Sequence, residues 1–441
     1  MDEAISILAG SGSIGDGYGR TSHEGRRAIL MAREGEVTEL KAIAETMKIE
    51  IVEIIRQSGK PDPHGYFGRG RLQDVADELN TRVADHPWTG VDLVLIHTNA
   101  TPRQLVNVNS TLKIEVWDRV RLLLALFISH ASSVEARTQV RIAQLQADSM
   151  ILRELAKQET IGERAGFGAG GRQALQNVLT TVSRELASLR KRQSRYVQAR
   201  KERRRQRSKG GAKTIGLVGY TNAGKSSLFL SLSGKKVIIE DKLFSTLETT
   251  VGRMEMSPRI LLTDTIGFID DLPSDLLDAF HATLDESLQC DLLLLLADSS
   301  DEESEIIRKL EISHREITER RNDSNLKIKV VLTKSDKECN ESSLIGIVNE
   351  LGFRDSIVVS AHTGDGIKEL KEEILVSLFG QPYSISISEG TAKERACESI
   401  ISEIYDIGIV TTRENNHLTL WCSKAELDRL ISKTDGRISL K

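Results

Sequence analysis

The sequence predicts an α/β fold: a parallel sheet with helices on both faces, preceded by a small α/β subdomain and a long antiparallel helical hairpin, and followed by a small α+β unit. Three observations lead to this prediction. Several short runs, such as "DLLLLLA" and "KIKVVL", are apolar throughout, as expected for strands buried on both faces. Helix-like stretches alternate with these runs, which is typical of parallel sheets. Two longer stripes repeat at helical spacing, and 441 residues suffice for about three domains.

Residues 1–118 are expected to form the small α/β subdomain. The predicted strands are the apolar runs "AISILA", "IEIVEII", "DLVLI" and "KIEV", and "EVTELKAIAETMK" is a predicted helix between the first two. A loop punctuated by Pro and Gly, "KPDPHGYFGRGRL", carries Arg69 and Arg71. We take these two arginines as candidate contacts to RNA or to a nucleotide phosphate.

Residues 119–209 follow a helical period and predict a hairpin. One stripe begins at Val134 and ends at Leu155, and a second begins at Leu175 and ends at Tyr196. Between them lies "GERAGFGAGG", residues 162–171, whose glycines each disfavour a helix by about 1 kcal/mol. Two long helices joined by a glycine-rich loop are expected to pack against each other as an antiparallel pair.

The end of the second helix is strongly basic. From Arg184 to Lys209 the sequence has twelve Lys or Arg and two Glu, in a chain whose formal net charge is −4. One interpretation is a solvated helix face. The other is a salt-sensitive contact with the phosphate backbone of RNA, made by Arg203, Arg204 and Arg205. Concentrated arginine in an acidic chain favours the second interpretation.

Residues 213–380 return to alternating strands and helices and predict the central domain. Residues 383–441 predict a small α+β domain. Its predicted strands are "YSISIS", "GIVTTR" and "HLTLWC", its helices are expected from Thr391 and Lys424, and we find no chemical motif in it.

The composition, 39% hydrophobic and 28% charged, is that of an ordinary globular protein. The four cysteines show no zinc spacing, so we expect reduced thiols. We expect no signal peptide, and the longest apolar runs are far shorter than the ~18 residues of a spanning helix. These features predict a monomeric cytoplasmic protein without integral membrane association.

The stretch "GYTNAGKS", residues 219–226, lies between a predicted strand and a predicted helix, which is the context of a P-loop. Gly219 and Gly224 allow backbone N–H groups to turn inward around phosphates, and the helix N-terminus favours negative charge. Lys225 is expected to reach the β- and γ-phosphates, and the Ser226 hydroxyl is expected to bind Mg²⁺.

The choice of base is predicted by "VVLTKSD", which places Thr333, Lys334 and Asp336 at a strand end. We call residues 333–336 the base loop. An aspartate carboxylate can accept two parallel hydrogen bonds, which guanine offers through N1–H and its 2-amino group and adenine does not. The Lys334 stem can lie over the base plane. The backbone of Ser360 and Ala361, after the next strand, is expected to donate to guanine O6.

Further candidates follow two other strand ends, where open α/β sheets bind ligands. In "LLTDTIGFIDDLP", Asp264 is expected to hold Mg²⁺ through water, and the Gly267 N–H to sense the γ-phosphate. In "DKLFSTLETT", Thr246 is expected to close onto Mg²⁺ when the γ-phosphate is present, so that these loops form a nucleotide-dependent switch.

The motifs GYTNAGKS, FSTL, DTIG, TKSD and SAHTG, in this order, resemble those of translation-factor-class P-loop GTPases. The stretches "DKLFSTLETT" and "DTIGFIDDLPSDLLDAF" narrow the resemblance to the HflX family, in the Obg–HflX branch. Outside this domain, "KPDPHGYFGRGRL", "DLVLIHTNATPRQL" and "ARTQVRIAQL" are also similar to that family. The nucleotide-binding positions that the resemblance implies are Gly219, Tyr220, Thr221, Asn222, Ala223, Gly224, Lys225, Ser226, Ser227, Phe244, Ser245, Thr246, Leu247, Asp264, Thr265, Ile266, Gly267, Thr333, Lys334, Asp336, Ser360 and Ala361.

The resemblance implies a GTP-hydrolysing switch protein that associates with the ribosome, chiefly the large (50S) subunit and its rRNA, in splitting, recycling or stress response. It also implies a second purine nucleotide, ATP, at the N-terminal domain. The alternative is an RNA-binding ribosome assembly or hibernation factor that senses guanine nucleotide with little turnover. A phosphate-release assay distinguishes the two.

Asn222 has a further candidate role in hydrolysis. Many GTPases have a glutamine after the DxxG glycine that orients water, and this chain has Phe268 there. With Asn222 in its P-loop, the chain resembles hydrophobically substituted GTPases that recruit K⁺ beside the phosphates. A cation there would stabilise charge in the transition state. The alternative is that Asn222 only hydrogen-bonds the loop backbone. The expected catalytic set is therefore Thr246, Gly267 and Asn222.

Overall fold

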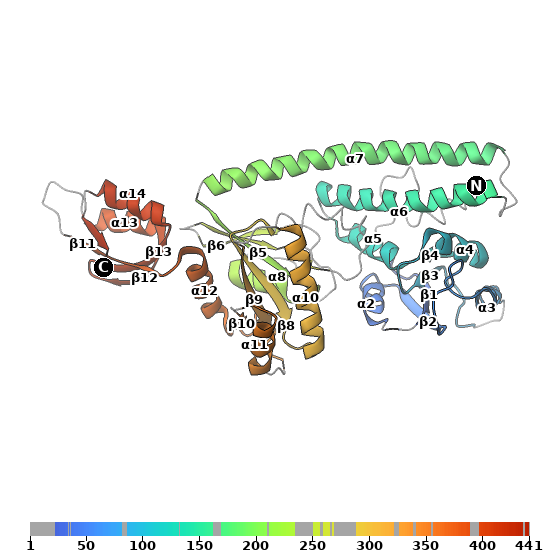
Figure 1. Ribbon diagram of the computed structural model, residues 1–441, viewed down its shortest axis with the longest axis horizontal. Coiled ribbons are helices and arrows are strands. Elements are labelled where there is room, and N and C mark those ends of the chain that lie inside the picture. The colour runs from blue at the N-terminus through green and yellow to red at the C-terminus, as the bar shows by residue number, and fades with distance from the viewer. Residues whose placement is uncertain are drawn as a thin grey trace. The chain divides into compact units, whose positions relative to one another are not determined.

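Figure 1 shows the computed structural model. It describes two compact units, one with the described residues up to Gln198 and the other with those from Ala199 onward. The predicted strand "AISILA" lies outside the described residues, and so do residues 162–168 of the glycine-rich loop. The described residues are 23–33, 35, 37–81, 86–131, 133–161, 169–209, 211–233, 250–255, 259–264, 267–268, 288–321, 326–337, 341–353, 356–388, 397–434 and 437–440.

The first unit contains a four-stranded parallel sheet with the order β2-β1-β3-β4. Three strands coincide with predicted runs, whereas β1, "RAILMA", was not predicted. Strand β2 lies on one side of β1, and β3 and β4 lie on the other. The order in which successive strands are added to the sheet therefore reverses between β1 and β3. The strands are β1 Arg27–Ala32, β2 Glu50–Arg56, β3 Leu93–Ile96 and β4 Glu115–Trp117.

Four of the described helices accompany this sheet. Local capping explains where two of them begin: Thr101 and Gln104 form a reciprocal capping box before α4, and Asp118 accepts the N–H of Arg121 at the start of α5. Arg69 and Arg71 lie in the first turn of α3, whose N-cap is Gly68, and not on the expected loop. The helices are α2 Thr38–Thr46, α3 Arg69–Leu79, α4 Pro102–Leu112 and α5 Arg119–His130.

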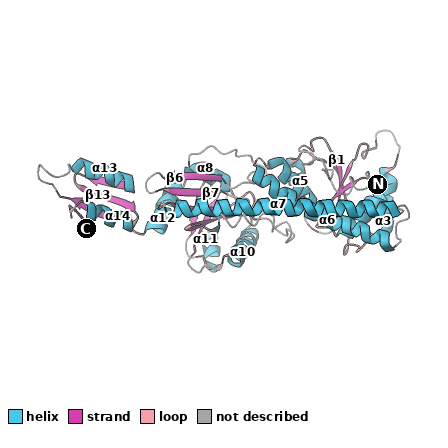
Figure 2. Ribbon diagram, turned by 90° about the horizontal axis from the view of Figure 1, so that it is seen from above, coloured by secondary structure: helices cyan, strands magenta, loops and turns pink. Residues whose placement is uncertain are grey.

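The two long helices are α6, Val134–Ile161, and α7, Ala169–Lys209. In the first unit they lie side by side (Figures 1 and 2), and Arg141 Nε lies 2.9 Å from Glu185 Oε1 across the pair. Apolar side chains of both helices share one core with the first sheet. Helix α7 already includes two glycines in its first turn, residues 170 and 171, because it begins at Ala169.

The second unit contains a six-stranded sheet with the order β10-β9-β8-β5-β7-β6, parallel except for the antiparallel pairing of β6 with β7. Strand β8 is buried along its whole length. Its alternate side chains enter two separate cores, one on each face of the sheet. The strands are β5 Lys213–Gly219, β6 Thr250–Glu255, β7 Ile260–Asp264, β8 Leu292–Asp298, β9 Lys327–Thr333 and β10 Ser356–Val358.

Helices cover both faces of this sheet, which confirms the predicted fold class. Helices α8 and α12 contribute to the core on one face, and α10 and α11 to the core on the other. Because β5, β7, β8 and β9 are parallel, their carboxyl ends meet at one edge of the sheet. The helices are α8 Lys225–Ser233, α10 Glu303–Arg320, α11 Glu341–Glu350 and α12 Ile367–Phe379.

The C-terminal part has the β-α-β-β-α-β order of a ferredoxin-like unit, with an antiparallel sheet in the order β12-β13-β11-β14. Trp421 joins the core of the six-stranded sheet, and its Nε1 donates to the carbonyl of Gly380, 3.1 Å away. The four domain boundaries expected from the sequence stay predictions. The elements are β11 Tyr383–Ile387, α13 Cys397–Ile407, β12 Gly408–Glu414, β13 His417–Cys422, α14 Lys424–Lys433 and β14 Ile438–Leu440.

Candidate functional site

The P-loop joins β5 to α8 through a turn that only a few residue types tolerate. Gly219, Asn222 and Gly224 have φ angles of 153°, 63° and 76°. A Cβ at position 219 would lie 2.4 Å from the carbonyl oxygen of Leu296, so the position requires glycine. Asparagine is among the non-glycine residues that adopt positive φ most readily, and Asn222 is exposed. The turn therefore gives Asn222 a backbone role of its own.

Lys225 is buried at the centre of this loop, with 6% of its surface exposed. Its Nζ lies 2.7 Å from the carbonyl oxygen of Tyr220 and 3.3 Å from that of Gly219, and donates to both. Burial lowers the pKa of Lys225 to about 8; the nearby Asp264 carboxylate raises it and Lys334 lowers it further. Burial of the ammonium among carbonyl groups thus disfavours its charged form, and an anion bound in the loop would stabilise that form.

Ser226 and Asp264 come together from two different elements. The Ser226 hydroxyl, in the first turn of α8, donates to Asp264 Oδ2 at the end of β7, 3.0 Å away. Asp264 is fully buried. A hydroxyl and a carboxylate at this distance are oxygen ligands of the kind that Mg²⁺ prefers.

Gly267 and Phe268 lie directly against the P-loop. The Phe268 N–H donates to the Gly219 carbonyl at 2.9 Å, and the Thr221 N–H donates to the Phe268 carbonyl at 3.2 Å. A Cβ at position 267 would lie 2.9 Å from the backbone nitrogen of Thr221 and 2.6 Å from Lys225 Nζ, so a side chain does not fit there. The Phe268 side chain is buried in the core beneath α10 and α11. It cannot orient water, as the sequence predicted.

The base loop is tied to the P-loop by Thr333. Its buried hydroxyl lies 2.9 Å from the carbonyl oxygen of Ala223 and 3.1 Å from that of Ala297, so its single proton is shared between these two acceptors. Lys334 adopts a positive φ of 61° and its Nζ pairs with Asp298 Oδ2 at 2.6 Å. The loop that follows β9 is therefore fixed from two sides.

Asp336 is exposed and is oriented by a buried serine. The Ser360 hydroxyl donates to Asp336 Oδ1 at 2.6 Å, and this hydrogen bond is the main reason why the pKa of Asp336 is lowered. Ser360 is fully buried, and its Oγ accepts the N–H groups of His362 and Thr363. The carboxylate is thus ionised and pre-oriented. Ala361 follows at once, and its carbonyl accepts from Ser231 at 3.3 Å.

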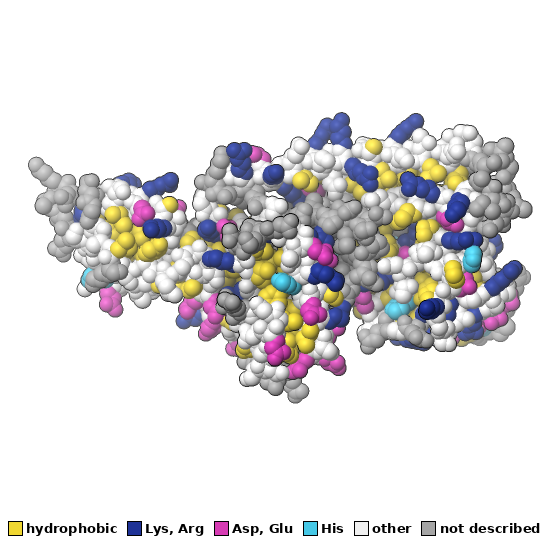
Figure 3. Space-filling model, in the orientation of Figure 1, with side chains coloured by type: hydrophobic (Ala, Val, Ile, Leu, Met, Phe, Trp, Pro, Cys, Tyr) yellow, Lys and Arg dark blue, Asp and Glu magenta, His cyan; other side chains and the backbone are white. Residues whose placement is uncertain are grey.

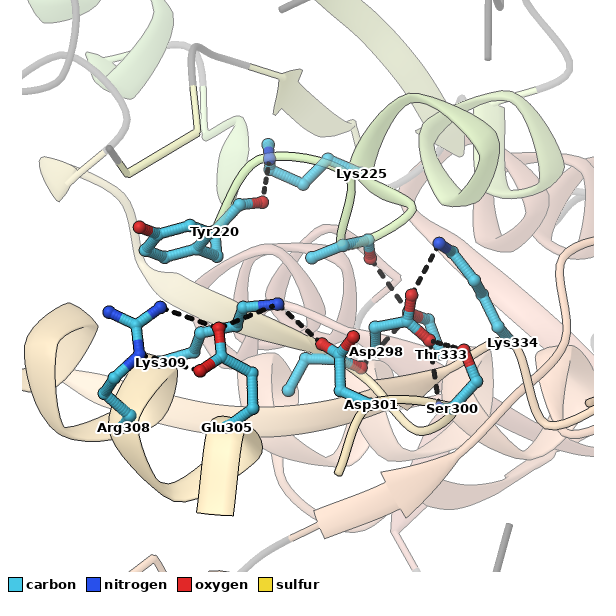
Figure 4. A network of polar contacts seen from close by, with 12 residues as sticks. Tyr220, Lys225, Asp298, Ser300, Asp301, Glu305, Arg308, Lys309, Thr333 and Lys334 are labelled. Atoms are coloured by element: carbon cyan, nitrogen blue, oxygen red, sulfur yellow. Dashed lines mark hydrogen bonds and ion pairs between the residues drawn. The ribbon is translucent and has the colours of Figure 1, made fainter. Parts of the chain in front are cut away.

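Sequence reasoning missed the turn of residues 298–301, which follows β8. The Ser299 hydroxyl and N–H both donate to the Thr333 carbonyl, at 2.7 and 2.9 Å, and Asp298 holds Lys334. Figure 4 shows this turn between the base loop and helix α10. The signal in the sequence is an aspartate that ends an apolar strand, as Asp264 does.

Several predicted site residues cannot be placed among the described residues. Phe244, Ser245, Thr246 and Leu247 lie outside the described residues, and so do Thr265 and Ile266. Ser227 lies in the first turn of α8 and is half-buried.

The candidate RNA contacts are far from the P-loop in sequence. Arg69 and Arg71 are exposed at the start of α3, and Arg203 and Arg205 are exposed on α7. The side chain of Arg204 lies outside the described part of that helix. Among the described helices, none is both long and apolar enough to cross a bilayer.

A P-loop between strand and helix, a TKSD loop tied to it, and a DxxG glycine against it together define a P-loop GTPase. Residues 214–334 match a family model described as "50S ribosome-binding GTPase", and residues 34–128 match one described as "GTP-binding GTPase N-terminal". The chain belongs to the GTPase HflX family, as the resemblance predicted, and it binds and hydrolyses GTP.

The relatives are similar over most of the chain. The GTPase HflX of Methanocaldococcus jannaschii is 36% identical over 347 residues, which cover 78% of this chain and 83% of the relative. That of Thermofilum pendens is 31% identical over 392 residues, which cover 86% and 89%. A solved structure of a GTP-binding protein from Sulfolobus solfataricus in complex with GDP is 25% identical and covers 80% of this chain and 98% of that one, with a TM-score of 0.45.

Proposed function

We propose that this GTPase is a nucleotide-controlled switch that associates with the large ribosomal subunit. The observation that carries the proposal is the basic end of α7. Every described Lys and Arg side chain from Arg184 to Arg205 is exposed except Arg200, which is half-buried. In Figure 3 such side chains stand out along α7. A row of exposed arginines suits the phosphate backbone of RNA. The name of the family model matched by residues 214–334 agrees with this partner.

The P-loop supplies the phosphate site. When a nucleotide enters, Lys225 exchanges the carbonyls of Gly219 and Tyr220 for oxygens of the β- and γ-phosphates. Ser226 would hold Mg²⁺ directly and Asp264 would hold it through water, and both are suitable oxygen donors. Mg²⁺ would neutralise phosphate charge there. Thr246 is proposed to close onto the same site, and the Gly267 N–H to contact the γ-phosphate.

The base loop supplies guanine recognition. The exposed Asp336 carboxylate, held by Ser360, accepts the N1–H and 2-amino groups in parallel. The backbone of Ser360 and Ala361 donates to O6. Thr333 replaces the asparagine commoner at its position and keeps one link to the P-loop through the Ala223 carbonyl. The Thr333 hydroxyl thus links the base site to the phosphate site directly.

Hydrolysis requires a group that stabilises charge between the β- and γ-phosphates. Phe268 is buried and offers none. Asn222 is exposed on the P-loop, and we propose that its side-chain oxygen helps to hold K⁺ there. Its positive φ equally agrees with a purely structural role, so the two are separated by experiment below.

The N-terminal unit is proposed to hold a second purine nucleotide, ATP. The order β2-β1-β3-β4 creates a topological switch point between β1 and β3, and open α/β sheets bind ligands at such points. Gly35 and His97 meet there, since a Cβ at position 35 would lie 3.6 Å from His97 Cε1. ATP titration of the full chain with its P-loop saturated by GDP tests this, and an absence of ATP binding contradicts it.

Co-sedimentation with purified ribosomal subunits tests the main proposal. The full chain is expected to pellet with large subunits more in the presence of a non-hydrolysable GTP analogue than of GDP. Charge reversal of Arg203, Arg204 and Arg205 to Glu should abolish most of this binding and lower its salt dependence.

The matched control reverses three exposed cations on other helices, Lys368, Lys424 and Arg429, and changes the net charge equally. Equal loss in both triple variants would show a non-specific charge effect. Unchanged binding in the α7 variant would show that these arginines form a solvated helix face and do not contact the ribosome.

A further inference from the structure

The ring of Tyr220, the residue after the first P-loop glycine, is held by helix α10. Arg308 Cζ lies 5.4 Å from the ring centroid and Lys309 Nζ lies 5.3 Å from it. Figure 4 shows both side chains reaching the ring from the first half of the helix. Cations at these distances are attracted by the quadrupole of an aromatic face.

The two cations are themselves fixed by carboxylates. Arg308 makes two hydrogen bonds to Glu305, of 2.8 and 2.7 Å. Lys309 pairs with Asp301 at 2.7 Å, and the two side chains are only 18% and 25% exposed. A partly buried ion pair is screened less than an exposed one. Lys309 is therefore held in place on the Tyr220 ring.

The backbone of Tyr220 lies among the groups that receive phosphate. Its carbonyl accepts Lys225 Nζ at 2.7 Å. The N–H of the next residue, Thr221, donates to Phe268, which follows the γ-phosphate-sensing Gly267. A shift of the Tyr220 peptide would thus move the phosphate-binding Lys225 and the loop glycine Gly267 together.

The same Asp301 belongs to the turn that supports the base loop. Asp298 at its start pairs with Lys334, and Ser299 donates to the Thr333 carbonyl. The turn thus contacts the base loop through Asp298 and helix α10 through Asp301. A continuous set of contacts runs from guanine recognition to the P-loop.

We propose that Tyr220 is a positioning residue for GTP hydrolysis, and that Asp301 and Lys309 hold it so that a base bound at residues 333–336 fixes the P-loop. This inference rests on the assignment of the P-loop and base loop proposed above. Misplacing reacting groups lowers the rate more than it weakens binding. Loss of the Tyr220 contacts is therefore expected to lower kcat while KM for GTP changes little.

The test uses the full chain and steady-state GTP hydrolysis. Tyr220→Leu and Lys309→Met are each expected to lower kcat about fivefold, with KM changed by less than about twofold. The double variant should be no slower than the slower single variant, because each single variant already removes the contact between Lys309 and the ring. Tyr220→Phe keeps the ring and should keep the wild-type rate. Lys368→Met, on α12, is the matched control and should leave kcat unchanged.

Three results would overturn the inference: an unchanged kcat in both single variants, a loss in Tyr220→Phe equal to that in Tyr220→Leu, or independent effects that multiply in the double variant.

Titration with a fluorescent GDP analogue distinguishes a failure of the proposed role of Tyr220 from a wrong assignment of the nucleotide site. A wild-type chain that binds no guanine nucleotide would refute the assignment itself. Tight binding with equal kcat in all variants would refute only the role of Tyr220. If Tyr220→Leu does not fold, Lys309→Met and the Phe variant carry the test.

Discussion

Raising the pH from 7 to 9 is expected to weaken GDP binding about tenfold, because Lys225 must take up a proton as the phosphates enter the P-loop. Burial lowers the pKa of Lys225 to about 8 in the nucleotide-free chain. Phosphate charge beside the ammonium would raise that pKa back toward its ordinary value of 10.5. Well below pH 8 Lys225 is charged both in the free chain and in the complex, so it does not make the affinity depend on pH. Above pH 8 the free chain has lost the proton that the complex requires.

The magnitude follows from the charged fraction of Lys225 in the free chain. With a pKa of about 8, roughly 10/11 of the chains carry the charge at pH 7 and roughly 1/11 at pH 9, a ratio of about ten. A rise of the Lys225 pKa from about 8 to 10.5 on binding corresponds to a change of about 3 kcal/mol in the free energy of GDP binding. The whole of this change is reached only at a pH near 10.5. Lys225 is buried, so solvent does not screen this contribution appreciably.

Fluorescence titration with a GDP analogue between pH 7 and pH 9 measures this effect. Lys225→Arg is the control, because arginine stays charged throughout this range. Titration of the guanine base and of the phosphates affects both proteins equally. The dissociation constant of the wild type divided by that of Lys225→Arg should therefore rise about tenfold from pH 7 to pH 9. A ratio that is independent of pH would show that Lys225 takes up no proton when GDP binds.

Three further predictions concern single residues of the site. Asp336→Asn should shift preference from GTP toward xanthosine triphosphate, because the amide donates where xanthine accepts; a variant that still strongly prefers GTP in competition binding contradicts the role of Asp336. Replacing Na⁺ by K⁺ at constant ionic strength should raise GTP hydrolysis, and Asn222→Ala and Asn222→Gly should both remove the difference while GTP binding is kept. The glycine variant tolerates the φ of 63°, so K⁺ stimulation that survives in it would show that Asn222 serves the backbone only. Thr333→Val should weaken GDP binding about fivefold, since the buried carbonyl of Ala223 loses its donor; equal affinity would show that the hydroxyl does not couple the two loops.

The central sheet and the P-loop could be predicted from the sequence because their signals are local. The run of residues 292–298 is apolar at every position but the last, and its side chains do enter cores on both faces. The spacing of Gly219, Gly224 and Lys225 also specifies a strand-to-helix turn without reference to the rest of the chain.

The contacts that hold the site residues in place could not be predicted in the same way. Asp298 meets Lys334, and Lys309 meets Tyr220, only because β8 lies between β5 and β9 in the sheet order. A single sequence does not reveal that order. Strand β1 was missed because its six residues, "RAILMA", carry no alternation and few β-branched residues. The start of α3 was not predicted because the prolines and glycines just before Arg69 are typical of a loop.

The switch proposal is tested by the rate of phosphate release from GTP, measured with and without purified large ribosomal subunits. We expect slow hydrolysis by the chain alone and a rate at least several-fold higher with large subunits. The triple reversal of Arg203, Arg204 and Arg205 should remove the stimulation and leave the basal rate unchanged. Equal rates with and without large subunits, at concentrations where the chain co-sediments with them, would contradict the switch and favour a factor that binds RNA and senses guanine nucleotide with little turnover.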